Sequence, residues 1–197
     1  MRGLSQLMHF ELTTSATRAA DDRLATAQAI IAGYEPSNDH QAQQQRQMLD
    51  FVAQHSDALL RTCVPGHLTA SAIVTDAARS KVLLTLHRKL GKWLQFGGHC
   101  DGDGNLLGCA WRETHEESGI IPHAISRSPI DLDVHTIPPH GNDPEHLHLD
   151  TRYWVVVPDG AEESVSAESI ELGWFTPDEC TRLDLDESVT RLIDLVF

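Results

Sequence analysis

Residues 97–120 read GGHCDGDGNLLGCAWRETHEESGI, and this stretch decides the fold. It begins with a glycine-rich polar turn at residues 97–104 and continues into a short segment that is compatible with a helix. Gly119 follows that segment and can adopt the left-handed conformation that ends a helix. The stretch therefore predicts a glycine loop that leads directly into a short helix.

Carboxylates gather on one face of this predicted helix. Glu113, Glu116 and Glu117 are spaced i, i+3 and i+4. Like charges on one face repel unless a cation lies among them, and Mg²⁺ prefers carboxylate and carbonyl oxygens as ligands. Arg112 can pair with Glu116 at i+4 and hold that carboxylate. A solvated acidic helix is the alternative, but it would need neither the glycine loop before it nor the glycine after it.

The same stretch resembles the signature box of the Nudix hydrolases. That box runs glycine, five residues, Glu, seven residues, then Arg-Glu-apolar-x-Glu-Glu-x-Gly-apolar. The positions of this chain that match it in register are Gly98, Arg112, Glu113, Glu116, Glu117, Gly119 and Ile120.

The resemblance implies an α/β fold, a Nudix-type α/β/α sandwich with a mixed sheet. It also implies metal-dependent hydrolysis of the diphosphate linkage in a nucleoside diphosphate derivative or a related small diphosphate. By resemblance, Mg²⁺ or Mn²⁺ is held by Glu116, Glu117 and the backbone carbonyl near Gly97. Glu113 is then a ligand or the general base, and Arg112 is a structural partner of the carboxylates.

Many members of that family add a glutamate from a loop after the box. The resemblance makes Glu168 the preferred candidate, because it precedes a predicted strand in an acidic loop. The other candidates are Glu162, Glu163 and Glu171.

Two positions depart from the family pattern. Gly104 stands where the first Glu is usual, and Thr114 stands where an aliphatic residue is usual. Because the missing Glu is usually a supporting residue, we expect weakened rather than abolished metal binding. The departure leaves open a binding or regulatory module that kept the fold and lost efficient turnover. A diphosphate isomerase on the same fold, using the histidines, is a further alternative.

Other polar residues are candidates for the site. In HLHLDTR the strand period of two places His146, His148 and Asp150 on one face. These side chains could bind a transition metal, hold a diphosphate, or form a satisfied hydrogen-bond network. His99 and Asp101 lie in the glycine loop, where we expect contact with metal or substrate.

Composition excludes several classes of function. The formal net charge of −14 argues against binding to a nucleic acid polymer, which requires Lys and Arg to neutralise phosphates. No apolar run approaches the roughly 20 residues that a membrane span needs. The N-terminus lacks the apolar core of a signal peptide, and the cysteines form no CxxC pair, so we expect a cytoplasmic protein.

The order of patterns along the chain predicts two parts. Residues 1–62 are expected to form a helical hairpin appendage, and residues 63–197 the Nudix domain. The hairpin could serve as a lid or a homodimer interface, and the Gln-rich run at 41–47 is expected on its solvated side. Residues 122–129 are expected to be irregular, and a capping box predicts a helix after Thr176. Strands are expected at 67–75, 81–88, 92–96, 130–137, 146–158 and 171–175.

Overall fold

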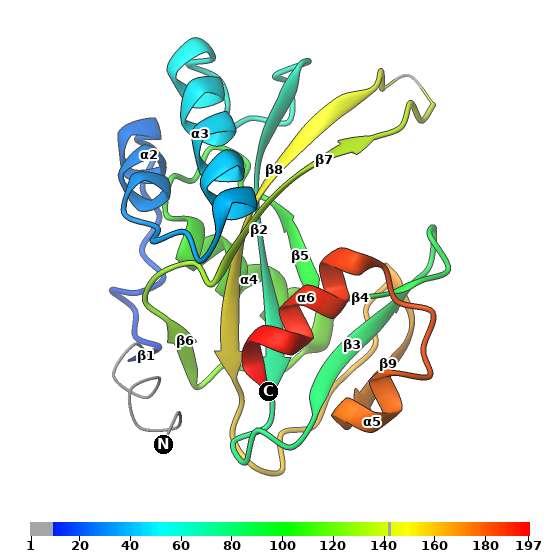
Figure 1. The fold of residues 1–197 in the computed structure, drawn as a ribbon. Helices are drawn as coiled ribbons and strands as arrows, with labels where there is room; N and C mark the ends of the chain where they lie inside the picture. The colour runs from blue at the N-terminus through cyan, green and yellow to red at the C-terminus, as the bar shows by residue number, and fades with distance from the viewer. Residues whose placement is uncertain (1–9, 142) are drawn as a thin grey trace.

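The computed structural model describes residues 10–141 and 143–197, so the N-terminal part of the predicted hairpin (residues 1–9) lies outside the described residues (Figure 1). In chain order the elements are β1 (Phe10–Leu12), α2 (Leu24–Ala32), α3 (Asp39–Gln54), β2 (Gly66–Thr75), β3 (Val82–His87), β4 (Trp93–Leu94), β5 (Phe96–His99), α4 (Leu106–Ser118), β6 (Ala124–Ser126), β7 (Asp131–Ile137), β8 (His146–Val156), β9 (Ser169–Phe175), α5 (Pro177–Cys180) and α6 (Glu187–Val196).

The strands of the described residues form one mixed sheet. Strand β2 pairs in parallel with β8 from Gly66 opposite Leu147 to Thr75 opposite Val156, and the other pairings are antiparallel. Every residue of β2 is buried, which is the pattern of a central strand covered on both faces. The predicted mixed sheet is confirmed.

Helices cover the two faces of this sheet. Strand residues such as Leu68 and Ala70 pack with Leu106 of α4 in the larger core cluster. Alternate residues such as Ile73 pack with Leu192 of α6 in a second cluster. Figure 1 shows α6 in front of the sheet and α4 behind it. The predicted α/β/α sandwich is confirmed.

Two short strands correct the sequence interpretation. Phe10–Leu12 form β1, although the whole N-terminal region was expected to be helical, and Ala124–Ser126 form β6, although 122–129 was expected to be irregular. The two strands pair with each other, and β6 also pairs with β8. Strands of three residues are too short to show a periodicity, so only their pairing reveals them.

The Gln-rich run is a second correction, because it is not simply solvated. The amide of buried Gln41 accepts from Leu132 N–H (2.9 Å) and donates to Leu132 C=O (3.1 Å), and Gln44 accepts from Val134 N–H (2.6 Å). Strand β7 pairs with β8 on its other side. These glutamines therefore satisfy the free edge of β7, which otherwise would leave buried backbone groups without partners.

The helices α2 and α3 also contribute Ile31 and Met48 to the core that contains Leu68 and Leu106. The proposed boundary at residue 62 stays a prediction. Among the described residues, none of the helices combines the length and apolar character that a membrane crossing requires.

Candidate active site

The helix α4 carries the carboxylates and is fixed at both ends by its own sequence. The Asn105 side chain accepts from Gly108 N–H (3.1 Å) and caps the first turn, while Gly119 ends the helix at a φ of 71°. The apolar side of α4 is buried against β2 and β5, and Glu113 and Glu117 lie against the glycine loop, at Gly98 and Gly97 respectively.

The three glutamates differ in exposure and in their contacts. The side chain of Glu116 is 57% exposed, that of Glu113 is 13% exposed, and Glu117 is buried. Arg112 lies 2.6 Å from a Glu113 oxygen and 3.5 Å from a Glu116 oxygen, so the predicted Arg112–Glu116 pair is present. The same guanidinium donates to the His99 carbonyl (2.8 Å), which ties the helix to the loop.

The charge on this cluster is incompletely compensated. Burial first, then the charges of Glu113 and Glu168, raise the pKa of Glu117 to about 8, while the Gly97 backbone acts in the opposite direction. Burial also raises the pKa of Glu113, although Arg112 opposes the shift. One oxygen of Glu117, Oε2, is buried and has no hydrogen-bond partner.

These observations fit a hard divalent cation, which takes oxygen ligands and neutralises adjacent carboxylates. Glu113, Glu116 and Glu117 are the carboxylates that would hold it. Among the described residues, two sets of three metal-ligand side chains have ligand atoms that all lie within 4.8 Å of one another. The box glutamates do not form such a set. The carboxylates would therefore turn inward to share an ion.

The two glycines at the start of the loop have separate reasons to be glycine. A Cβ on Gly98 would lie 2.5 Å from the Glu113 carboxylate, and a Cβ on Gly97 would collide with Ser71 on the paired strand β2. A side chain at Gly97 would meet the backbone of β2, whereas one at Gly98 would displace the Glu113 carboxylate. The loop can therefore approach both the helix carboxylates and the sheet.

Glu168 lies in an exposed loop whose charge reaches the site. Burial is the main cause that raises the pKa of Glu113 and of Glu117, and the charge of Glu168 adds to the rise at both. Arg88 holds this loop, because its backbone N–H donates to the Glu168 carbonyl (2.9 Å) and its guanidinium donates to the carbonyls of Ala167 (3.0 Å) and Ser169 (2.6 Å). Arg88 therefore fixes the position of the acidic loop.

The loop residues His99 and Asp101 point to different partners. Asp101 pairs with Arg61 (2.5 Å), a partner that sequence reasoning missed because it lies in the connection after α3. The His99 ring lies 4.9 Å from that of His67 and 5.2 Å from that of His148, measured between centroids. His99 thus joins the glycine loop to a group of histidines on the sheet.

The predicted trio His146, His148 and Asp150 is divided by the structure. Asp150 is buried and accepts from Thr69 (3.0 Å), Ser71 (2.6 Å) and Arg152 (2.9 Å). It belongs to a network in which Arg152 and Arg191 pair with Asp131 and Asp133 beneath α6. This is the satisfied hydrogen-bond network that the sequence left open. His146 and His148 precede Asp150 at the start of the same strand and lie among the other histidines.

Comparison with models of protein families shows which family the chain belongs to. The model of the NUDIX domain matches residues 65–195, more than half of the chain. The chain belongs to the NUDIX family. NUDIX enzymes hydrolyse phosphorus-containing anhydrides, and this is the class of reaction of the chain.

The chain is also similar to solved structures. The chain is 14% identical to a dihydroneopterin triphosphate pyrophosphohydrolase from E. coli, with a TM-score of 0.53, covering 64% of this chain and 92% of that one. A NUDIX-family hydrolase from Clostridium perfringens is 23% identical (TM-score 0.49; 66% and 98% covered). The NUDIX domain of Shewanella oneidensis NrtR, solved with ADP ribose, is 17% identical (TM-score 0.49; 74% and 94% covered). No curated protein matches the sequence.

The departure of this chain from the NUDIX box at Gly104 has a structural cause. The Gly104 N–H donates to the Asp21 carbonyl, and a Cβ at this position would collide with the Arg23 carbonyl. Asp103 and Asn105 on either side also bond to the N-terminal segment, through Asp21 N–H (2.9 Å) and the carbonyl of Thr17 (2.9 Å). The N-terminal segment therefore occupies the space in which the usual glutamate side chain would start.

Proposed function

We propose that this chain hydrolyses the diphosphate linkage of a nucleoside diphosphate derivative or a related small diphosphate. In this proposal Mg²⁺ or Mn²⁺ is held by Glu113, Glu116 and Glu117 and by the Gly97 carbonyl. The observation that carries the proposal is the buried Glu117, whose Oε2 has no partner inside a cluster of carboxylates. A divalent ion bound there supplies charge neutralisation for the diphosphate oxygens.

Other residues of the site would then have separate roles in the reaction. Arg112 holds the Glu113 carboxylate and the His99 carbonyl, so it fixes the helix against the loop. Glu168 is our candidate to accept the proton from the attacking water, because its charge contributes to the raised pKa of both Glu113 and Glu117. A general base must reach that water within about 2.6–3.2 Å, or through one further water. His99 and Asp101 lie in the glycine loop and are proposed to contact the substrate.

The four cysteines are buried and free. We therefore propose a reducing, cytoplasmic setting for the enzyme, since such thiols persist where disulfides are rare. A homodimer formed through the N-terminal helices stays a prediction.

The test is hydrolysis of a panel of compounds with Mg²⁺ or Mn²⁺. The panel contains ADP-ribose, a dinucleoside tetraphosphate and dihydroneopterin triphosphate, which are named for similar structures, together with other nucleoside diphosphate derivatives. Wild type is compared with Glu117→Gln and with Glu35→Gln, a matched change at an exposed glutamate between α2 and α3. We expect turnover of at least one compound by wild type and by Glu35→Gln, and its collapse in Glu117→Gln. Equal turnover by the three proteins would refute the assignment of the metal ligands.

A matched pair of variants tests whether Glu168 is the general base. Glu168→Gln and Glu162→Gln change two exposed glutamates of the same acidic loop. We expect kcat to fall roughly 10²–10⁴-fold in the first, as for loss of a general base, with no change in the second. An unchanged kcat in Glu168→Gln would assign the base elsewhere in the cluster.

A further inference from the structure

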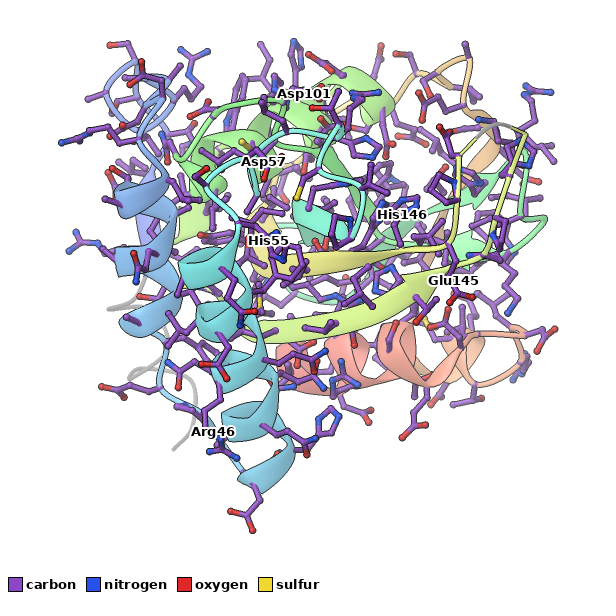
Figure 2. The ribbon with its side chains drawn as sticks, turned by 90° about the horizontal axis from the view of Figure 1, so that it is seen from above. Arg46, His55, Asp57, Asp101, Glu145 and His146 are labelled. Carbon is purple, nitrogen blue, oxygen red and sulfur yellow. The ribbon has the colours of Figure 1, made fainter. Side chains whose placement is uncertain are left out.

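Five histidines lie close together on the face of the sheet next to the glycine loop: His67, His99, His135, His146 and His148. The parallel register of β2 and β8 places His67 opposite His148, and the antiparallel register of β7 places His135 opposite His148 on the other side. The ring centroids of His67 lie 5.0 Å from His146 and 4.8 Å from His148. Figure 2 shows His146 on β8, where that strand begins. Strands far apart in sequence thus bring their imidazoles together.

His67 is the buried centre of this group. It is 3% exposed, and neither of its ring nitrogens has a hydrogen-bond partner. Leaving a buried polar group without a partner costs roughly 1–3 kcal/mol, so such a group in a native protein calls for an explanation. Stacking against other imidazoles does not provide a partner for the ring nitrogens.

A metal ion would provide that partner. One nitrogen from each of His67, His146 and His148 lies within 4.8 Å of the others. Imidazole suits zinc and similar first-row ions, and Zn–N bonds of about 2.0–2.1 Å place ligand nitrogens in a tetrahedral site about 3.4 Å apart. Small rotations of the rings would therefore bring the three nitrogens to one ion.

The hydrogen bonds around the group also suit a metal. The Nδ1 of His146 lies 2.9 Å from the Pro144 carbonyl, which can only accept, so Nδ1 carries the proton and Nε2 is free to bind. Ligating histidines commonly donate their second nitrogen to a carbonyl in this way.

We propose that His67, His146 and His148 bind one divalent transition-metal ion of the zinc class, at a site separate from the glutamate box. Three histidines would leave a fourth position for water or another ligand, and the His99 ring lies 4.9 Å from that of His67 and 5.2 Å from that of His148. Nitrogen donors here and oxygen donors in the box would select different ions. The site adjoins the box through His99, whose carbonyl binds Arg112.

The test measures metal binding by the full-length chain. Chelator-treated wild type is titrated with Zn²⁺ by calorimetry and with Co²⁺ by visible absorption, which reports tetrahedral coordination. The same titrations are made on His146→Gln, on Glu117→Gln in the box, and on His55→Gln. The last residue belongs to a second set of close ligand-type side chains, His55, Asp57 and Cys63. Figure 2 shows His55 and Asp57 near the end of α3.

We expect one Zn²⁺ per chain in wild type, Glu117→Gln and His55→Gln. In His146→Gln the affinity should fall about 100-fold or more, because loss of even an outer hydrogen-bond partner of a ligand costs roughly 10–100-fold. Zn²⁺ should also raise the Tm of wild type and leave that of His146→Gln unchanged. Circular dichroism checks that this variant, changed at a half-buried strand end, is folded.

Three results would overturn the proposal. They are the absence of stoichiometric Zn²⁺ binding by wild type, equal affinity in His146→Gln, and loss of the ion in His55→Gln or Glu117→Gln instead. The first two would leave the histidines as packed imidazoles, and the third would move the ion to another site.

Discussion

Gly98 faces the Glu113 carboxylate so closely that a Cβ at position 98 would lie 2.5 Å from Glu113 Oε2. The obstructing atoms are the far end of a flexible side chain, so Gly98→Ala should fold with little loss of stability. Glu113 would have to move, and a displacement of about 1 Å in a site can cost roughly 10²-fold in rate. We expect kcat to fall by about that factor. Assays of hydrolysis, with thermal unfolding of the same samples, check both halves of the expectation.

The control for this change is Gly91→Ala. Gly91 has no atom within 4 Å of an added Cβ, and its φ of 63° makes any substitution slightly strained. We expect Gly91→Ala to lose some stability and to retain activity, the opposite of Gly98→Ala. Full activity of Gly98→Ala would mean that the position of Glu113 does not limit the reaction.

Substitution of Gly104 tests why this chain lacks the first glutamate of the NUDIX box. Restoring the usual residue with Gly104→Glu should not raise activity, because any Cβ there collides with the Arg23 carbonyl. Overpacking of this kind costs about 1–3 kcal/mol, and it should loosen the N-terminal segment. Urea unfolding measures the cost, limited proteolysis reports the loosening, and Gly91→Glu in open space is the control. Higher activity in Gly104→Glu would show that the glycine weakens catalysis.

The sequence predicted the box and most of the long elements, because these carry strong local patterns. The spacing of Glu113 and Glu117 and the alternation in β8 are properties of single segments. The partner of Asp101, the docking of Asp21 on Gly104 and the role of Gln41 depend on contacts between distant segments. His67 was missed for the same reason. It lies in an ordinary β-rich strand, and only the parallel register with β8 brings it to His148.

Arg152 is expected to be essential for stability rather than for chemistry. Its side chain is 2% exposed, and its guanidinium contacts Asp150 (2.9 Å) and Asp133 (3.0 Å). Arg152→Met would leave buried Asp150 without its cation, which typically costs about 3–5 kcal/mol. Urea unfolding should show this loss, whereas Arg182→Met at an exposed position should stay within about 0.5 kcal/mol of wild type. A loss below 1 kcal/mol in Arg152→Met would contradict the network.

Gln41 should be the most sensitive residue of the Gln-rich run. Gln41→Leu keeps an apolar body of similar size but leaves the Leu132 N–H and C=O without partners. We expect a loss of about 2–4 kcal/mol, since each buried group left unsatisfied costs roughly 1–3 kcal/mol. Gln47→Leu, at an exposed position of the same helix, is the matched control. Similar unfolding curves for the two variants would contradict the proposed bridge between α3 and β7.

The raised pKa of Tyr34 should make the free energy of unfolding depend on pH in the alkaline range. It is buried, and its hydroxyl donates to Gln41 (2.8 Å). Burial, and then the charge of Asp131, raise the pKa of Tyr34 to about 12, whereas the unfolded chain keeps a value of about 10. Between these values the unfolded chain has released a proton that the folded chain retains. The contribution is therefore complete below about pH 10 and is lost as the pH rises toward 12.

The comparison of wild type with Tyr34→Phe isolates this residue from other groups that titrate in the same range. At about pH 8 the variant should be less stable, because the hydrogen bond to Gln41 is lost at a cost of about 1 kcal/mol. From about pH 10 to 12 the wild-type free energy of unfolding should fall faster than that of the variant, by up to about 2.7 kcal/mol for a shift of two pKa units. Urea unfolding at a series of pH values measures both curves. Parallel curves would mean that Tyr34 titrates alike in the folded and unfolded chains.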